Sequence, residues 1–498
     1  MLRVYREDDT PLYVQAADAL RARILAGEFR PGDKLPSVRR LSDELGVNPA
    51  TVVAAYRILT SEGLAEARAG SGAYVPEGLV LPAAGIEARA GRAPRMPVGP
   101  DGLVPPRRDG AGSAPDGRRG GAFDLSRNAP PRELYPLAEL KRFIVEAIDA
   151  DGGEAFDYQE AGGYAPLRAA IAARISTEGG GRPVDPADLH IVSGAQQGLD
   201  LAARVLLRRG DVAAVEDPGY RGAADAFVAA GARVHGLPLD GEGLELGALE
   251  RLAATRPLRL VHLSPACQNP TGIRYSEARR AALAALAERY GFYISEDDAF
   301  GDLAGPDAPR PVRAFDSAGR VILIKSFSKS VLPGLRIAGM EVPHALRERF
   351  EDSKRSVDLS SSGLMQRALE RFLSSGSYDR HLATARARYR AAYARFARRL
   401  RPLKALGFDW DEPALGLFLW LALPAGYGSA AFAATLAERG VIVAPASAFR
   451  LPAAGDDAGG GGRSGRERLR ISFGALAEDE LDAAADALVA AAEGPERG

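Results

Sequence analysis

Residues 321–336, VILIKSFSKSVLPGLR, place two lysines four positions apart among small hydroxyl side chains, after an apolar run and before an arginine. A lysine that follows a buried strand and lies among hydroxyl groups is a candidate for imine formation with an aldehyde. Lys329, between Ser328 and Ser330, fits this description. Lys325 lies within the apolar run itself and is therefore the weaker candidate.

The aldehyde that such a lysine binds in proteins is pyridoxal 5'-phosphate, which also needs polar partners for its ring and its phosphate. Three residues are candidates for the ring: Asp297 in SEDD for the pyridinium nitrogen, Asn269 in QNPTG for the phenolate oxygen, and Tyr220 in EDPGY for stacking. Helix N-terminal amides, hydroxyls and guanidinium groups bind phosphate. The candidates for that role are Ala195 and Gln196 in SGAQQ, Ser326, Ser328 and Arg336.

Each of these residues has a plainer interpretation when it is taken alone. NPTG is most often a turn, a pair of aspartates after a strand is most often a cap, and a single tyrosine is most often a packing residue. The joint order favours one shared site, because five strand ends supply five complementary roles.

Six short apolar segments of the C-terminal block are typical of strands, each with helix-like sequence beside it. They are ADLHIVSG, DVAAVEDPGY, ARVHGLPL, LRLVHLSP, GFYISEDD and RVILIKSFSK. This alternation predicts an α/β domain with a mostly parallel central sheet. Ligands bind at the carboxyl ends of strands in such sheets, so the candidate side chains are expected to meet at one edge.

The first 76 residues are organised differently. Apolar stripes follow Thr10-Pro11, Ser37 and Asn48-Pro49, which are helix-start signals, and Gly46 turns the chain between the last two helices. LAEARAGSGAYV then reads as two short strands around a glycine-rich tip. Helix, turn, helix and wing predict a DNA-binding domain, and a plain helical bundle with a hairpin is the alternative. The phosphate-contact candidates are Arg39, Arg40 and Arg68, and the base-contact candidates are Asn48 and Thr51.

Between the two blocks, residues 77–121 are rich in proline, glycine, alanine and arginine and predict a flexible linker. Residues 453–467 predict a shorter flexible surface loop within the C-terminal domain. The chain has 498 residues, a net charge of −1 and a single cysteine, Cys267, which fits two or three domains in a reducing compartment. We find no signal peptide and no apolar run of membrane length, so we expect a cytoplasmic protein with no membrane or metal partner.

The run GEFRPGDKLPSVRRLSDELGVNPATVVAAYRILTSEGLAEARAGSGAYV closely resembles the GntR-type winged helix. This resemblance implies binding to double-stranded DNA as a dimer. It places Arg39, Asn48, Thr51 and the wing residues Gly70, Ser71 and Gly72 at DNA-contacting positions. Pro49 and Val53 stand where some relatives have arginine, which bears on the operator sequence and not on DNA binding itself.

From about Tyr158 to Phe473 the chain resembles fold-type I pyridoxal phosphate enzymes, the aspartate aminotransferase superfamily. The resemblance implies that Arg470, in LRISFG, grips a substrate carboxylate. It also implies that Tyr158 reaches the cofactor phosphate of a neighbouring subunit, so that the site needs a homodimer. Two positions depart from the family pattern: Phe300 replaces a tyrosine that bonds the ring oxygen, and Ala338 replaces a glycine.

End to end, the sequence resembles the MocR family of bacterial transcriptional regulators. The predicted domains are a winged helix (1–76), a linker (77–121) and an aminotransferase-like domain with large and small subdomains (122–498). The resemblance implies a head-to-tail homodimer that binds an operator. It also implies sensing of an amine or amino acid, or of the cofactor itself, through aldimine formation at Lys329.

Two other functions stay open. One is a working class I/II aminotransferase that carries a DNA-binding domain. Full turnover is doubtful on this sequence because of Phe300, whereas half-transamination is compatible with Lys329, Asp297, Asn269 and Arg470. The other is a cofactor-binding protein that has lost DNA binding.

Overall fold

The computed structural model describes residues 12–25, 28–61, 64–68, 72–77, 118–119, 122–178, 182–415, 417–451 and 466–493. The chain divides into two compact units, Met1–Val104 and Pro105–Gly498. Most of the predicted linker (77–121) and most of the predicted loop (453–467) lie outside the described residues. Arg118–Arg119, which the sequence analysis assigned to the linker, instead form a short strand, β3, because they pair with β4.

Unit 1 contains three helices and a two-stranded hairpin: α1 (Leu12–Leu25), α2 (Val38–Leu45), α3 (Pro49–Ser61), β1 (Glu66–Arg68) and β2 (Gly72–Tyr74). Ser37 caps α2, since its side chain accepts the Arg40 N–H at 3.2 Å, and Gly46 ends that helix in the left-handed region. The predicted apolar stripes form one core, which includes Leu20, Leu41, Leu45, Val52 and Leu59. The predicted winged helix-turn-helix fold is confirmed.

Unit 2 is built on a seven-stranded sheet with the order β5-β13-β12-β11-β10-β6-β7. The strands are β5 (Leu189–Val192), β6 (Val212–Glu216), β7 (Arg233–Leu237), β10 (Leu258–Leu263), β11 (Tyr293–Asp298), β12 (Val321–Ser326) and β13 (Ala338–Glu341). The six predicted strands are all present and run parallel. The strand that was not predicted, β13, pairs antiparallel with both of its neighbours.

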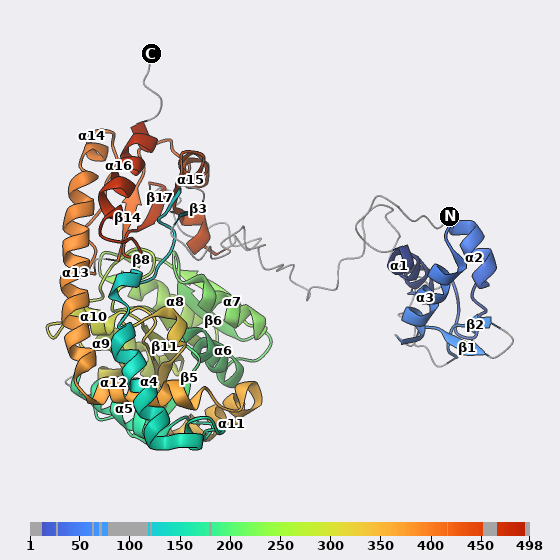
Figure 1. Ribbon diagram of the computed structural model, residues 1–498, viewed down its shortest axis with the longest axis horizontal. Coiled ribbons are helices and arrows are strands. Elements are labelled where there is room, and N and C mark those ends of the chain that lie inside the picture. The colour runs from blue at the N-terminus through green and yellow to red at the C-terminus, as the bar shows by residue number, and fades with distance from the viewer. Residues whose placement is uncertain are drawn as a thin grey trace, which may run out of the picture. The chain divides into compact units, whose positions relative to one another are not determined.

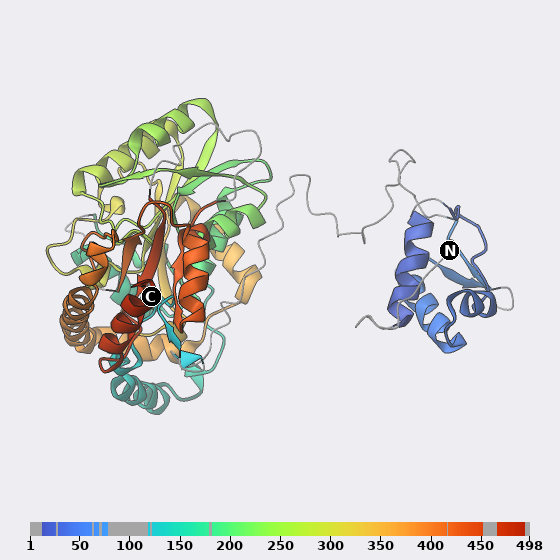
Figure 2. The same ribbon diagram turned by 90° about the horizontal axis from the view of Figure 1, so that it is seen from above.

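Helices cover both faces of this sheet, as Figures 1 and 2 show. They are α5 (Ala165–Glu178), α6 (Ala195–Leu206), α7 (Arg221–Ala229), α8 (Leu246–Thr255), α9 (Glu277–Tyr290), α10 (Gly301–Ala304), α11 (Arg347–Asp358) and α12 (Gly363–Ser374). Alternate residues of β12 enter different cores: Ile322 packs with α6 and α7, whereas Leu323 packs with α5 and α12. Because successive strand residues point to opposite faces, both faces of β12 are buried, and its sequence is continuously apolar up to Lys325.

The C-terminal part of unit 2, together with β4 from its start, which pairs with β15, forms a smaller layer of sheets and helices. Its elements are β4 (Ala122–Asp124), α14 (Pro402–Ala405), β14 (Phe418–Ala422), α15 (Ser429–Glu438), β15 (Val441–Ile442), β16 (Ala444–Pro445), β17 (Arg468–Ser472) and α16 (Glu480–Glu493). Two further elements are α4 (Leu137–Asp151) and the hairpin of β8 (Leu239–Asp240) and β9 (Gly243–Leu244). In the three-stranded sheet β14-β17-β16, the central strand is β17, which carries Arg470.

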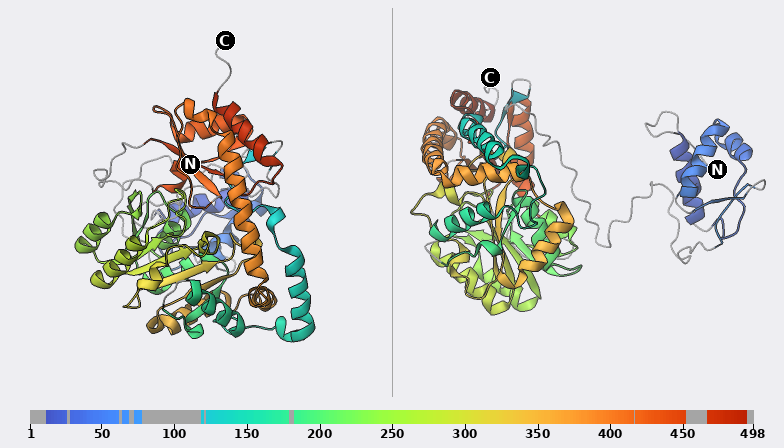
Figure 3. Two further views of the ribbon diagram at one scale, coloured as in Figure 1. Left: turned by 90° about the vertical axis from the view of Figure 1, so that its left-hand side faces the viewer. Right: turned by 60° about the horizontal axis from the view of Figure 1, so that its bottom comes forward.

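One long helix, α13 (Ser377–Arg399), joins the large and small parts of unit 2 (Figure 3). At its start, His381 Nε2 lies 2.7 Å from the backbone oxygen of Ser330, in the turn after β12. Near its end, Arg395 Nε donates to Asp482 of α16 at 2.8 Å. None of the helices that the structure describes is long and apolar enough to span a bilayer.

Candidate functional site

Lys329 lies in the turn directly after β12, as its position behind the apolar run predicts. Its amine donates to the backbone oxygen of Asn128, which comes from the segment after β4. Burial, reinforced by the charge of Arg470, lowers the pKa of Lys329 to about 8, although Asp297 acts in the opposite direction. A larger fraction of this amine is therefore uncharged near neutral pH than of an ordinary lysine, which is the state that attacks an aldehyde.

Asp297 is the fifth residue of β11, the strand next to β12. Burial and the neighbouring Asp298 carboxylate raise the pKa of Asp297 to about 7, against the attraction of Lys329. Its Oδ1 is buried and has no hydrogen-bond partner among the described residues. Buried polar atoms in folded proteins are almost always paired, so this oxygen fits a site that receives an N–H from a bound group.

Arg470 and Asn269 meet opposite Lys329. Arg470 Nη1 donates to Asn269 Oδ1 at 2.8 Å, and Nη2 donates to the backbone oxygen of Ser126 at 2.6 Å. The guanidinium carbon lies 4.7 Å from the ring centroid of Phe449. Burial lowers the pKa of Arg470 to about 10, so the group is cationic at neutral pH. The contact uses the oxygen of the Asn269 amide and leaves its NH₂ to donate elsewhere.

The N-terminus of α6 forms a cradle with Arg336. Gly194, the N-cap residue, has φ of 80° and offers no side-chain acceptor to the first helical N–H groups. Arg336 Nη2 donates to the Ser193 oxygen at 2.6 Å. A Cβ at Gly194 would lie 2.8 Å from the Arg336 guanidinium, which would have to shift, and the positive φ of this residue favours glycine in its own right. Backbone N–H groups and a guanidinium that face one space suit an anion such as phosphate.

The remaining cofactor candidates lie around this cradle. Ala195 and Gln196 form the first turn of α6. Tyr220, at the start of α7, donates its hydroxyl proton to Gln196 Oε1 at 2.9 Å, which brings two predicted residues together. Ser326 Oγ accepts the Ser328 N–H at 3.3 Å, so the hydroxyl of Ser326 shapes the turn that leads to Lys329.

Three residues lie apart from this group. Tyr158 is 85% exposed, so within one chain it is not brought to the others. Lys325 is buried and forms ion pairs with Asp298 and Asp302, at 3.2 and 2.7 Å, which ties its amine to carboxylates. Phe300 is buried edge-on against Phe418 with ring centroids 6.0 Å apart, so the position of the expected tyrosine hydroxyl is apolar.

Two family models match the chain. The model for bacterial regulatory proteins of the gntR family matches residues 12–75, and the model for aminotransferases of class I and II matches residues 122–488. YisV, an HTH-type transcriptional regulator of Bacillus subtilis (strain 168), is 33% identical over 88% of this chain and 90% of its own length. The probable rhizopine catabolism regulatory protein MocR of Rhizobium meliloti is 31% identical over 78% of this chain and 77% of its own length.

The match to YisV is longer than unit 2 and therefore extends into unit 1 as well. The chain belongs to the MocR family. It is a GntR-type regulator fused to an aminotransferase-like domain. The kynurenine aminotransferase of Pyrococcus horikoshii, solved in complex with PMP, superimposes with a TM-score of 0.69 and 28% identity, over 76% of this chain and 92% of its own. The predicted fold-type I architecture of this MocR-family chain is thereby confirmed.

In the winged helix of this MocR-family chain, Arg39 and Arg40 are exposed on α2. Asn48 is exposed ahead of α3, and its Oδ1 accepts the Ala50 N–H at 2.9 Å, so it caps the helix while its NH₂ stays available. Thr51 lies in the first turn of α3 and is half-buried. Of the wing candidates, Gly70, Ser71 and the side chain of Arg68 lie outside the described residues, and Gly72 has φ of 114° at the start of β2.

Sequence reasoning missed several residues that build this MocR-family site. Ser126 and Asn128 act through backbone oxygens, which every residue type offers, so no side-chain pattern marks them. Phe449 faces Arg470 from a short helical turn near the C-terminus. The sequence carries a partial signal that Phe449 belongs to a site, because this aromatic residue stands next to Arg450 just before the predicted loop.

Proposed function

We propose that unit 2 binds pyridoxal 5'-phosphate and that the protein is a cytoplasmic transcriptional regulator that senses a primary amine or amino acid, or the cofactor itself. When bound, the cofactor supplies an aldehyde that condenses reversibly with primary amines. The unpaired, buried Oδ1 of Asp297 carries this proposal. An isolated buried carboxylate oxygen is costly, and a ring N–H of the cofactor would pair with it.

The other groups take complementary roles. Lys329 is the amine that attaches the cofactor, Asn269 donates to the ring oxygen, and Tyr220 lies against the ring. The first N–H groups of α6, Arg336 and the hydroxyls of Ser326 and Ser328 hold the phosphate. Arg470 holds the carboxylate of an amino-acid ligand, because its guanidinium is buried and its charge acts on the amine of Lys329.

A homodimer completes the site in this proposal. The exposed large apolar side chains of unit 2 include Leu137, Val145, Ile148, Phe156, Tyr158, Val357 and Leu359. Leu137, Val145 and Ile148 share one face of α4. Tyr158 and Leu359 line one surface pocket. Grouped apolar side chains of this kind mark protein interfaces. We infer that a second copy covers them and that Tyr158 then reaches the phosphate of the partner's site.

Binding of the full-length protein to its own upstream DNA tests the regulatory proposal. We expect pyridoxal phosphate to give the protein a visible absorption band. We also expect a responsive amine or amino acid to change operator affinity by about fivefold or more, a typical coupling between two sites. A protein with the band but without DNA binding would instead be a cofactor-binding protein that has lost its operator.

The rival function is an aminotransferase that carries a DNA-binding domain, and the complete set of Lys329, Asp297, Asn269 and Arg470 favours it. Phe300 weighs against it, because an apolar ring replaces the hydroxyl that would help control proton transfer. Stopped-flow spectra with a panel of amino acids separate the two functions. Rapid conversion to the amine form of the cofactor, followed by many turnovers once a 2-oxo acid is added to accept the amino group, would identify an enzyme.

The capture of the cofactor by Lys329 should depend on pH. Because burial lowers the pKa of Lys329 to about 8, the uncharged fraction of its amine rises about tenfold per pH unit below pH 8 and levels off above it. We expect the rate at which the visible band forms, measured by mixing cofactor-free protein with pyridoxal phosphate, to follow this curve. A rate that rises steadily up to about pH 10 would mean an unperturbed lysine.

Arg39→Ala should weaken DNA binding about uniformly across operator variants, because an arginine exposed on α2 is expected to contact phosphate. We expect about a tenfold loss at moderate salt and a salt slope lower by about one. Fluorescence anisotropy over a salt series measures both quantities. Arg30→Ala, an exposed arginine ahead of α2, is the matched control. A loss confined to one operator variant would make Arg39 a base reader instead.

A further inference from the structure

A second cavity, of about 390 Å³, lies beside β11 and β12 on the face that carries Asp298 and Lys325. Asp297 and Asp298 are consecutive strand residues and therefore point to opposite faces of the sheet. The residues that line this cavity come from α5, from α10 and the loop after it, from the β10–α9 region and from α13. None of the residues proposed to hold the cofactor is among them, so this cavity is distinct from the site at Lys329.

Positive side chains dominate the lining of this cavity. Five lining side chains are cationic, namely Arg174, Arg274, Arg280, Lys325 and Arg386, and two are acidic, Asp298 and Asp302. Apolar residues such as Ile175, Ala266, Leu323 and several prolines fill the spaces between them. A volume in this range, with apolar walls and a few polar groups that converge on it, is typical of a small-molecule site.

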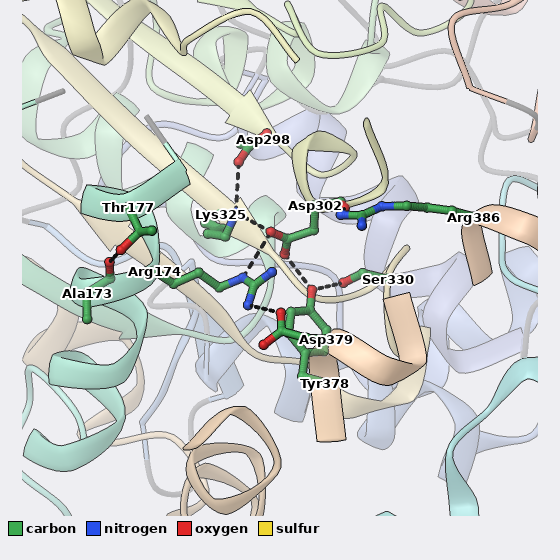
Figure 4. Close-up of polar contacts among 10 residues, drawn as sticks. All are labelled: Ala173, Arg174, Thr177, Asp298, Asp302, Lys325, Ser330, Tyr378, Asp379 and Arg386. Atoms are coloured by element: carbon green, nitrogen blue, oxygen red, sulfur yellow. Dashed lines mark hydrogen bonds and ion pairs between the residues drawn. The ribbon is translucent and has the colours of Figure 1, made fainter. Parts of the chain in front are cut away.

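The two carboxylates already form ion pairs with two of the cations, as Figure 4 shows. Lys325 Nζ lies 3.2 Å from Asp298 Oδ2 and 2.7 Å from Asp302 Oδ1. Arg174 Nε lies 3.2 Å from the same Asp302 oxygen, and its Nη1 lies 2.8 Å from Asp379. The other oxygen of Asp302 accepts the Tyr378 hydroxyl proton at 2.5 Å. Both oxygens of this central carboxylate are therefore occupied by protein groups.

The other three cations have no carboxylate partner within the part of the chain that the structure describes. Arg280 donates only to backbone oxygens, including those of Tyr275 and Pro265. Arg274 donates from Nη2 to the Ala414 oxygen at 3.1 Å, and Arg386 donates to the backbone oxygen of Asp302. Arg274 and Arg386 each also keep a buried Nε with no acceptor among the described residues.

The charges of Glu296 and Asp298 favour the cationic form of Arg280, so the uncompensated charge lies mainly at Arg274 and Arg386. Positive charge that is buried without a counter-ion is unfavourable, and an anion in the cavity would offset it. Guanidinium groups match the geometry of carboxylates, and the apolar walls match a carbon skeleton. We propose that this cavity binds a small organic acid through its carboxylate, recognised by Arg274, Arg280 and Arg386. This site lies on the opposite face of the sheet from Asp297 and takes a ligand that needs no amine.

Calorimetric titration of the full-length protein with glutarate, benzoate and inorganic phosphate tests this site. The titrations are run in an Arg470→Gln background, so that a carboxylate held at the proposed cofactor site adds no signal. We expect at least one of the two acids to bind saturably, at one site per chain. Arg386→Gln and Arg274→Gln should each weaken that binding by about tenfold or more, because each removes a charged hydrogen-bond donor.

Two further variants keep the test decisive. Ala304→Leu fills part of the cavity and keeps every charge, so it should weaken acid binding even where an arginine variant fails to fold. Arg390→Gln, an exposed arginine of the same helix as Arg386 that does not line the cavity, should leave binding unchanged. The proposal is overturned if neither acid binds, if only phosphate binds, or if the cavity variants bind the acid as tightly as Arg390→Gln.

Discussion

Lys329→Ala should abolish the visible absorption band that pyridoxal phosphate gives with the wild-type protein. The amine of Lys329 has a lowered pKa, and it lies in the turn after β12, where the charges of Asp297 and Arg470 act on it. Without this amine the cofactor has no covalent attachment at the site, and only its phosphate and ring contacts remain. Absorbance spectra of the purified variant, reconstituted with excess cofactor and then gel-filtered, measure this loss.

Borohydride reduction and peptide mapping complete that experiment. In the wild-type protein the reduced cofactor should be found on the peptide that contains Lys329. Lys404→Ala, which removes a lysine exposed at the surface and paired with Asp409, is the control and should keep the full band. A band that survives Lys329→Ala would refute the assignment, and a label on Lys325 would mean that its ion pairs with Asp298 and Asp302 do not hold in solution.

Arg470→Gln should raise the concentration of an amino acid needed for half-maximal spectral response by about 100-fold. Loss of one partner of a buried charge pair costs about 2–5 kcal/mol, and a factor of 100 corresponds to about 2.8 kcal/mol. The expected loss is specific to ligands that carry a carboxylate. For the amine that results from decarboxylation of the same amino acid, the concentration needed for half-maximal response should stay within about threefold of the wild-type value.

This comparison of ligands separates recognition from structure. Arg470 also binds Asn269 and the Ser126 oxygen, so a purely structural role would weaken the response to acid and amine alike. Arg468→Gln is the matched control, since Arg468 lies two residues earlier on β17 and donates to the Trp420 oxygen. Equal losses for both ligands in Arg470→Gln would remove the carboxylate assignment.

The sequence predicted the parallel part of the sheet because each of those strands is a short apolar run that ends in polar residues. It did not predict β13, because the sequence of this strand, AGME, has only four residues and one of them is glycine. Antiparallel pairing with β12 and β5 holds the strand in place. Pairing of this kind depends on tertiary context and leaves little local signal. The winged helix was easier, because Ser37 and Asn48 cap helices through their side chains and Gly46 adopts the left-handed backbone conformation that ends one.

The candidate site was predictable to the extent that its parts are side chains of distinctive type. Lys329, Asp297 and Arg470 follow or end strands and could be named from that placement. The oxygens of Ser126 and Asn128 could not, since backbone groups have no sequence signature. The cavity was equally hidden, because Arg274 and Arg386 lie about 110 residues apart along an arginine-rich chain.

The long helix α13 touches the turn that holds Lys329 at one end and the small subdomain at the other. It has 23 residues, which at 1.5 Å per residue makes it about 34 Å long. A rigid rod of that length, tilted by about 5° at the Ser330 end, moves its far end by about 3 Å. A rigid α13 would therefore act as a lever: a small tilt beside Ser330 would become, at Asp482 on α16, a shift wider than an atom.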